Sequence, residues 1–109
     1  MAATYKVLGQ VQPSAQTLST LYTVPSATEA VASSLIIANL GGFPTTYRVA
    51  VRPDGATIEN KHYVAYDISI GSLDSVALTL GVTINASDVV SVYSDSGLVT
   101  FNLFGSEIA

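Results

Sequence analysis

The chain has 109 residues, with four Lys or Arg and eight Asp or Glu, so its net charge at pH 7 is −4. Charged residues make up 11% of the sequence, against roughly 25% in an average soluble domain, while hydrophobic residues make up 49%. These values exclude a disordered chain, which combines low hydrophobicity with high charge. They also exclude a general nucleic-acid binder, which needs a basic surface.

Other classes are excluded by what the sequence lacks. The chain has no Cys, which excludes a disulfide scaffold and a thiolate metal site. No apolar run reaches about 18 residues, so we expect no membrane-spanning helix. Residues Met1 to Tyr5 lack the basic-then-apolar layout of a signal peptide. The length is that of one domain, and we expect residues 1–109 to form it.

Strand-forming residues dominate the chain. Val, Thr, Ile and Tyr are frequent, and alternating segments are bounded by Gly, Pro, Asn, Asp and Ser. The pattern predicts strands over, in chain order, Tyr5 to Val11, Thr17 to Val24, Val31 to Leu40, Thr45 to Arg52, Lys61 to Ile70, Ser75 to Ile84, Val89 to Ser94 and Leu98 to Phe104. Short strands at spacings of roughly 8–12 residues are typical of a sandwich or small barrel. We predict an all-β fold, a β-sandwich of about eight antiparallel strands in a jelly-roll or Greek-key-like order.

Turn residues and alternation predict finer details. Gly41 to Pro44 is expected to close a hairpin between the third and fourth strands. Asp95 to Gly97 is expected to close one between the last two strands, where Gly97 can take the left-handed conformation. Alternation places four residues of the sixth strand inward: Val76, Leu78, Leu80 and Val82. One face of the last strand carries Val99, Phe101 and Leu103. One face of the fifth strand is predicted to carry His62, Val64, Tyr66, Ile68 and Ile70.

No arrangement of residues predicts catalysis or metal binding. His62 is the only histidine, and no G-x-S-x-G motif accompanies it, so we interpret it as a strand-end or interface residue. Most carboxylates fall in turns, where Asp bonds its own backbone, with a weak Ca²⁺ site at the Asp54 or Asp88 loop as the alternative. We therefore predict no catalytic, metal-binding or cofactor-binding residue and no enzymatic activity.

Sparse charge on the outer strand faces favours self-association. A sandwich of this size usually carries more charge on its exposed faces, and apolar faces with few charges are often covered by neighbouring subunits. Arg48 and Arg52 share one face, and Lys61 and Asp67 are expected near them across a hairpin. The arginines either form cross-strand charge pairs within the chain or form salt bridges between subunits. The residues that we predict at an interface are Arg48, Arg52, Tyr63, Val90, Leu98 and Phe104.

Tyrosines suggest an alternative function. The six are Tyr5, Tyr22, Tyr47, Tyr63, Tyr66 and Tyr93. Exposed Tyr rings stack on sugars, whereas buried ones belong to β cores or interfaces. A carbohydrate- or receptor-binding module is the alternative hypothesis, with Tyr63 as the first residue to change.

Five segments resemble a known group of proteins. They are Tyr5 to Val11, Leu21 to Pro25, Tyr47 to Gly55, Lys61 to Asp67 and Val99 to Gly105. Over nearly its whole length the chain resembles small virion proteins of tailed bacteriophages, especially those of aquatic bacteria and cyanobacteria. The resemblance implies a β-sandwich building block of a neck, tail fibre, baseplate or head decoration. It also implies a homotrimer that docks on other virion proteins, with a host-surface glycan as a further partner. It implies no active-site residue, in line with the absence of nucleic-acid and membrane partners that charge and hydropathy indicate.

Overall fold

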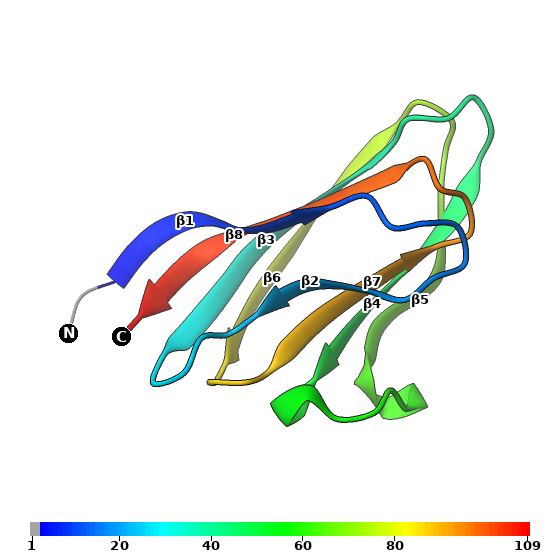
Figure 1. Cartoon of the computed structure of the whole chain (residues 1–109). Helices are drawn as coiled ribbons and strands as arrows, with labels where there is room; N and C mark the ends of the chain where they lie inside the picture. The colour runs from blue at the N-terminus through cyan, green and yellow to red at the C-terminus, as the bar shows by residue number, and fades with distance from the viewer. Residues whose placement is uncertain (1–2) are drawn as a thin grey trace.

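A computed structural model describes residues 3–109 as an almost entirely β structure (Figure 1). Met1 and Ala2, which begin the segment compared with a signal peptide, lie outside the described residues. The strands are β1 (Ala3–Val11), β2 (Ser19–Thr23), β3 (Glu29–Asn39), β4 (Thr45–Arg52), β5 (Tyr63–Ile70), β6 (Ser75–Ile84), β7 (Val89–Ser94) and β8 (Val99–Ile108). Two short 3₁₀ turns, η1 (Pro53–Gly55) and η2 (Asn60–His62), lie between β4 and β5. Over residues 3–109, no helix is long and apolar enough to cross a membrane.

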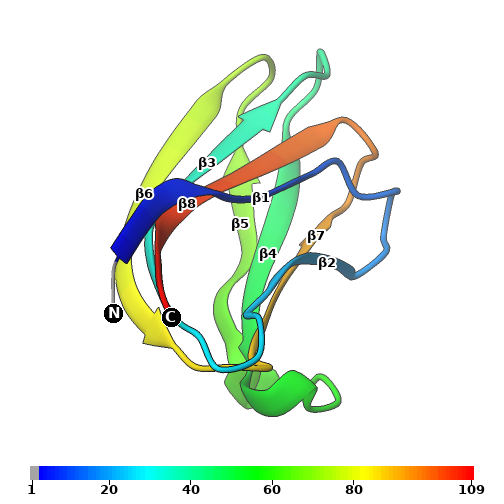
Figure 2. The ribbon, with the colours of Figure 1, turned by 60° about the vertical axis from the view of Figure 1, so that its left-hand side comes forward.

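The strands form two four-stranded antiparallel sheets packed face to face (Figure 2). The first sheet has the order β1-β8-β3-β6, and the second has the order β2-β7-β4-β5. Every connection except that between β4 and β5 passes from one sheet to the other. This is the strand order of a jelly roll. The predicted fold class is therefore confirmed.

The core lies between the two sheets and is built from the inward residues of each strand. Val99, Phe101 and Leu103 are fully buried, as their alternation predicts. The inward residues of β6 pack against the same core, again as predicted: Val76, Leu78, Leu80 and Val82. Tyr47 of β4 meets Phe101 of β8 edge to face with ring centroids 6.3 Å apart, which joins the two sheets at the centre.

Both predicted hairpins are wrong. β3 lies in the first sheet and β4 in the second, and β7 and β8 are likewise in different sheets. The turns at Gly41 to Pro44 and Asp95 to Gly97 therefore cross between layers. Gly97 does not have a positive φ; the glycines that do are Gly55 and Gly81. Loop chemistry signals a reversal of direction, but it does not decide whether the next strand pairs with the previous one.

The predicted face of β5 is also wrong at two positions. Val64 and Tyr66 are 57% and 52% exposed, whereas Ile70 is buried and Ala65 packs against the core. Register shifts flank Ala65, and Asp67 has a φ of 50°. Each extra residue in β5 reverses the phase of the alternation, so a regular two-residue period does not describe this strand.

Candidate binding surfaces

The outer face of the first sheet is a broad surface with little charge. Antiparallel pairing sets its rows, for example Val7 beside Phe104, Phe104 beside Ser34, and Ile36 beside both Asn102 and Ala77. We define the first outer face by the side chains that point away from the core over these strands: Tyr5, Val7, Gln10, Val31, Ser34, Ile36, Ala38, Ser75, Ala77, Thr79, Thr83, Thr100, Asn102, Phe104 and Ser106.

None of the residues of the first outer face is charged. Three charged residues occur in the strands of the first sheet over the described residues. Glu29 lies at the first position of β3, at one end of the sheet. Lys6 and Glu107 pair with each other at 2.7 Å, and Glu107 accepts a hydrogen bond from Tyr22 of the second sheet, so its side chain points inward. Glu29 therefore lies at the end of the sheet and Glu107 is largely covered, whereas Lys6 on the edge strand is 45% exposed and paired with Glu107.

Apolar side chains are exposed on this uncharged face. Tyr5 is 84% exposed, Val7 45% and Phe104 36%. Beside them, Gln10 Nε2 donates to Asn102 Oδ1 at 2.6 Å, which satisfies one polar pair across β1 and β8 without a charge. Exposed apolar residues that gather on one sheet face, rather than scatter singly, are typical of an interaction surface.

The four edge strands are all irregular. β1 and β6 border the first sheet, and β2 and β5 border the second. Each of β1, β2 and β6 has one register shift in its pairing with the neighbouring strand, and β5 has two. Bulges at an edge twist it away from a partner strand and oppose edge-to-edge pairing. Association through sheet faces is therefore favoured over association through edges.

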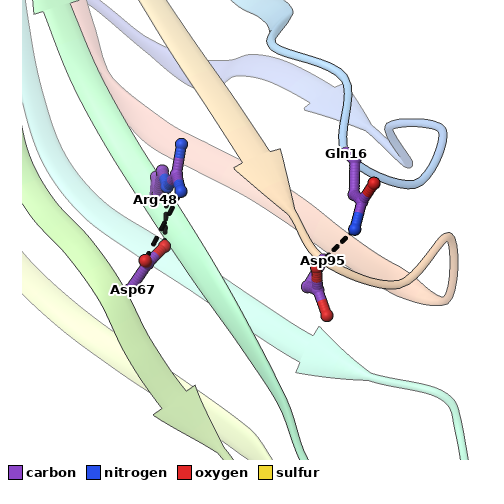
Figure 3. A network of polar contacts seen from close by, with 4 residues as sticks. All are labelled: Gln16, Arg48, Asp67 and Asp95. Atoms are coloured by element: carbon purple, nitrogen blue, oxygen red, sulfur yellow. Dashed lines mark hydrogen bonds and ion pairs between the residues drawn. The ribbon is translucent and has the colours of Figure 1, made fainter.

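Arg48 organises the outer face of the second sheet. Its Nε lies 2.6 Å from Asp67 Oδ1, so β4 and β5 are joined by an ion pair (Figure 3). Its guanidinium carbon lies 4.2 Å from the ring centroid of Tyr66 and 4.2 Å from that of Tyr93. The hydrogen bond to Asp67 raises the pKa of Arg48 further above its ordinary value. Of the two alternatives that the sequence leaves open for Arg48, the structure shows the pairing with Asp67 within the chain.

Three further hydrogen bonds stabilise this side of the molecule. Arg52 donates from Nε to Ser91 Oγ at 3.1 Å and from Nη1 to the carbonyl oxygen of Ala56 at 3.0 Å. These bonds tie the segment after β4 to β7. Figure 3 also shows Gln16, from the connection between β1 and β2, donating to Asp95 Oδ1 at 2.9 Å. Arg52 therefore serves the fold of its own chain, whereas its predicted role between subunits stays a prediction.

A hollow of ≈ 390 Å³ opens on the second sheet where β5 begins. Asn60, Tyr63 and Tyr66 line it. The two tyrosine rings have centroids 4.9 Å apart and planes at 82°, so they form a right-angled corner. This hollow contains Tyr63, which the sequence singled out for sugar stacking.

The structure spreads the predicted interface residues over different places. Arg48, Arg52 and Tyr63 belong to the second sheet, whereas Phe104 lies on the first outer face. Leu98 is 50% exposed just before β8. Val90 is only 2% exposed and packs in the core, so the single chain does not present it for contact. Both neighbours of Val90 in the chain are buried too, so β7 is covered on both faces within its own chain. The apolar run in β7 therefore needs no partner subunit to explain it.

His62 and the turn carboxylates have structural partners. His62 is buried, and its Nδ1 accepts the backbone N–H of Glu59 at 3.0 Å. Asp88 accepts the backbone N–H groups of Asp54 and Asn85 at 2.8 and 2.9 Å, so both of its oxygens stabilise turns. No group of three or more metal-ligating side chains occurs within residues 3–109. These contacts support the interpretation of His62 and Asp88 as structural residues.

Sequence reasoning missed several surface residues. Tyr5 and Val7 lie on the first outer face, and their alternation in the first predicted strand was the available signal. Tyr66 was placed on the wrong face, because the irregularity of β5 leaves no mark in the pattern. Asn60 comes directly before the predicted strand Lys61 to Ile70, and no motif in the sequence marks it.

Two comparisons with known proteins returned no relative. No protein-family model matches the chain, and no curated protein matches its sequence.

Proposed function

We propose that this chain is a non-enzymatic structural protein that self-associates through its first outer face. The observation that carries the proposal is the absence of charge over that face, together with the exposure of Tyr5, Val7 and Phe104. Two copies of an uncharged face meet without like-charge repulsion, although each chain carries a net charge of −4. The irregular edge strands favour this contact over continuation of a sheet from one chain to the next.

The sequence resemblance motivates a more specific form of this proposal. The particle that the chain builds is a tailed-phage virion, in which a closed homotrimer docks on other virion proteins. A closed oligomer suits such a building block, because the apolar surface is then buried in defined contacts rather than in open-ended growth. This part of the proposal is supported by the resemblance alone, whereas self-association is supported by the geometry of the face.

The native mass of the purified chain tests the proposal. We expect light scattering after size exclusion to give a defined multiple of the chain mass of 11.3 kDa. Three chain masses would support the trimer, and another closed oligomer would replace the trimer while keeping self-association. A single chain mass at high protein concentration would contradict the proposal.

Two matched valine variants locate the interface. Val7 of β1 and Val64 of β5 are 45% and 57% exposed on edge strands of different sheets. Val7→Glu places a charge on the first outer face, and we expect the concentration at which the oligomer dissociates to rise at least about ten-fold, because that charge would be buried without a partner. Val64→Glu should leave the native mass unchanged. The reverse result would place the interface on the second sheet.

A further inference from the structure

The hollow lined by Asn60, Tyr63 and Tyr66 lies on the sheet opposite to the proposed assembly face. Its volume of ≈ 390 Å³ falls within the range of roughly 300–1,000 Å³ that is usual for small-ligand sites. Tyr66 is 52% exposed and Asn60 is also exposed. A ligand could therefore reach this hollow while the first outer face is covered, so a function at this site is independent of self-association.

The irregularity of β5 creates the aromatic corner. Residues 63 and 66 are three positions apart and would point to opposite faces of a regular strand. A register shift lies between Tyr63, which pairs with Ala50, and Ala65, which pairs with Val49. The shift restores both tyrosines to the same outer face, where their planes meet at 82°. Bulges that redirect a side chain in this way are common beside functional sites.

Arg48 holds the corner in place before any ligand binds. The guanidinium lies 4.2 Å from the centroid of the Tyr66 ring and is itself fixed by Asp67. A ring that is already fixed loses little conformational entropy when it binds a ligand. The positive charge of the same guanidinium also disfavours cationic ligands. Aromatic rings attract organic cations, but Arg48 already supplies a cation to Tyr66 and would repel a second one.

Asn60 supplies the polar part of the hollow. Within residues 3–109 its side-chain amide has no hydrogen-bond partner, so its donors and acceptor remain free for a ligand. The two tyrosine hydroxyl groups can each donate and accept as well. An aromatic corner with an amide and hydroxyl groups suits a ligand that is apolar on the faces of its ring and rich in hydroxyl groups at its rim.

We propose that this corner binds a neutral saccharide. One sugar ring packs its C–H face against one tyrosine ring of the corner and its edge against the other. Its hydroxyl groups exchange hydrogen bonds with the amide of Asn60. Asp67 is engaged by Arg48, so the corner presents no free carboxylate to a cationic ligand. The proposal rests on the geometry of the hollow and does not depend on the oligomeric state.

A glycan array carrying neutral and acidic oligosaccharides is the first test. The neutral free sugar with the strongest signal is then titrated into the wild-type protein and its variants by calorimetry. We expect saturable binding of a neutral sugar, reduced at least about ten-fold by Tyr66→Ala and by Asn60→Ala. Tyr66→Phe should keep most of the affinity, because the ring remains. Tyr5→Ala is the matched control, since Tyr5 is an exposed tyrosine on the first sheet.

Several results would overturn the proposal. They are the absence of any glycan signal from the wild-type protein, a preference for acidic glycans, stronger binding of choline than of any sugar, and equal loss of affinity in Tyr5→Ala. Thermal melting of each variant shows whether it is folded, and Asn60→Ala provides the measurement if Tyr66→Ala does not fold. The native mass is measured separately, so failure here and failure of self-association are distinguishable.

Discussion

Asn39 is a buried polar residue at the end of β3 whose side chain organises two loops. It is 3% exposed, and its Nδ2 donates to the carbonyl oxygens of Phe43 and Gly71 at 2.8 and 3.0 Å. Its Oδ1 accepts the N–H of Gly41 at 2.9 Å. One side chain therefore satisfies backbone groups of the connection after β3 and of the connection between β5 and β6. Unpaired backbone groups at such a position are costly.

Asn39→Ala should therefore destabilise the protein more than most substitutions of a single side chain do. The variant leaves the three backbone partners unsatisfied, and we expect the free energy of unfolding to fall by about 2–3 kcal/mol. Urea denaturation measures it. Asn85→Ala is the control, because Asn85 is exposed and its bonds to Asp88 are made by its backbone, so its effect should stay within about 0.5 kcal/mol. Equal effects of the two variants would contradict the role of Asn39.

At the scale of the strand, close approach of two edges closes one side of the sandwich. A Cβ atom at Gly9 of β1 would collide with the carbonyl oxygen of Leu21 in β2, although the two strands belong to different sheets. A glycine is therefore required here by space rather than by a positive φ, since Gly9 is not among the residues with that conformation. The backbone of β1 packs directly on that of β2.

Gly9→Ala should force the two strands apart. We expect a loss of about 1–3 kcal/mol in the free energy of unfolding, because the obstacle is backbone and cannot rotate away. Gly42→Ala is the control, since nothing lies within 4 Å of a Cβ built at Gly42. Thermal and urea unfolding of both variants measure the difference. A stability of Gly9→Ala equal to that of Gly42→Ala would contradict the close approach.

The strands themselves were largely predictable, and their pairing was not. All eight predicted segments overlap an observed strand, because alternation and turn residues are local properties. The predicted strands began too late for β3 and ended too early for β8. Glu29 and Ile108 are paired with each other in the structure, but neither has a strand-like local pattern in the sequence. Which sheet a strand joins depends on partners that are distant in the sequence, and this is why both predicted hairpins were wrong.

In the candidate sites, too, local features were predictable from the sequence and features that depend on strand pairing were not. The pairing of Arg48 with Asp67 was one of two alternatives that the alternation in β4 left open, and the structure shows it. The corner formed by Tyr63 and Tyr66 did not, because the register shift within β5 is set by its pairing with β4. The uncharged first outer face combines four strands that the sequence does not order, so composition predicted low charge but not where the uncharged surface lies.

At the scale of the whole molecule, the two sheets are linked at one end by a polar cluster. Glu107 of β8 pairs with Lys6 of β1 and accepts a hydrogen bond from Tyr22 of β2. The hydrogen bonds from Lys6 and then Tyr22 lower the pKa of the Glu107 carboxyl group. Burial, followed by the hydrogen bond to Glu107, raises the pKa of Tyr22. Each partner therefore stabilises the other in the form needed for the contact, with Glu107 ionised and Tyr22 neutral.

Acid should weaken the molecule through this cluster. Because the pKa of Glu107 is lower in the folded than in the unfolded state, unfolding takes up a proton in the acid range. The stabilisation is present above the unfolded pKa and is lost as the pH falls through the folded pKa. Glu107→Gln should lower the free energy of unfolding by about 2 kcal/mol at pH 7, since bonds to a charged group are lost.

The same variant should flatten the dependence of stability on pH between neutral and acid conditions. Urea unfolding of the wild type and of Glu107→Gln across that interval measures both effects. Glu29→Gln is the matched control, because Glu29 is exposed at the start of β3 and should leave the acid slope unchanged. If Glu107→Gln retained the wild-type slope, the acid sensitivity would arise from carboxylates on the surface. The contacts of Glu107 with Lys6 and Tyr22 would then contribute little to the dependence of the free energy of unfolding on pH.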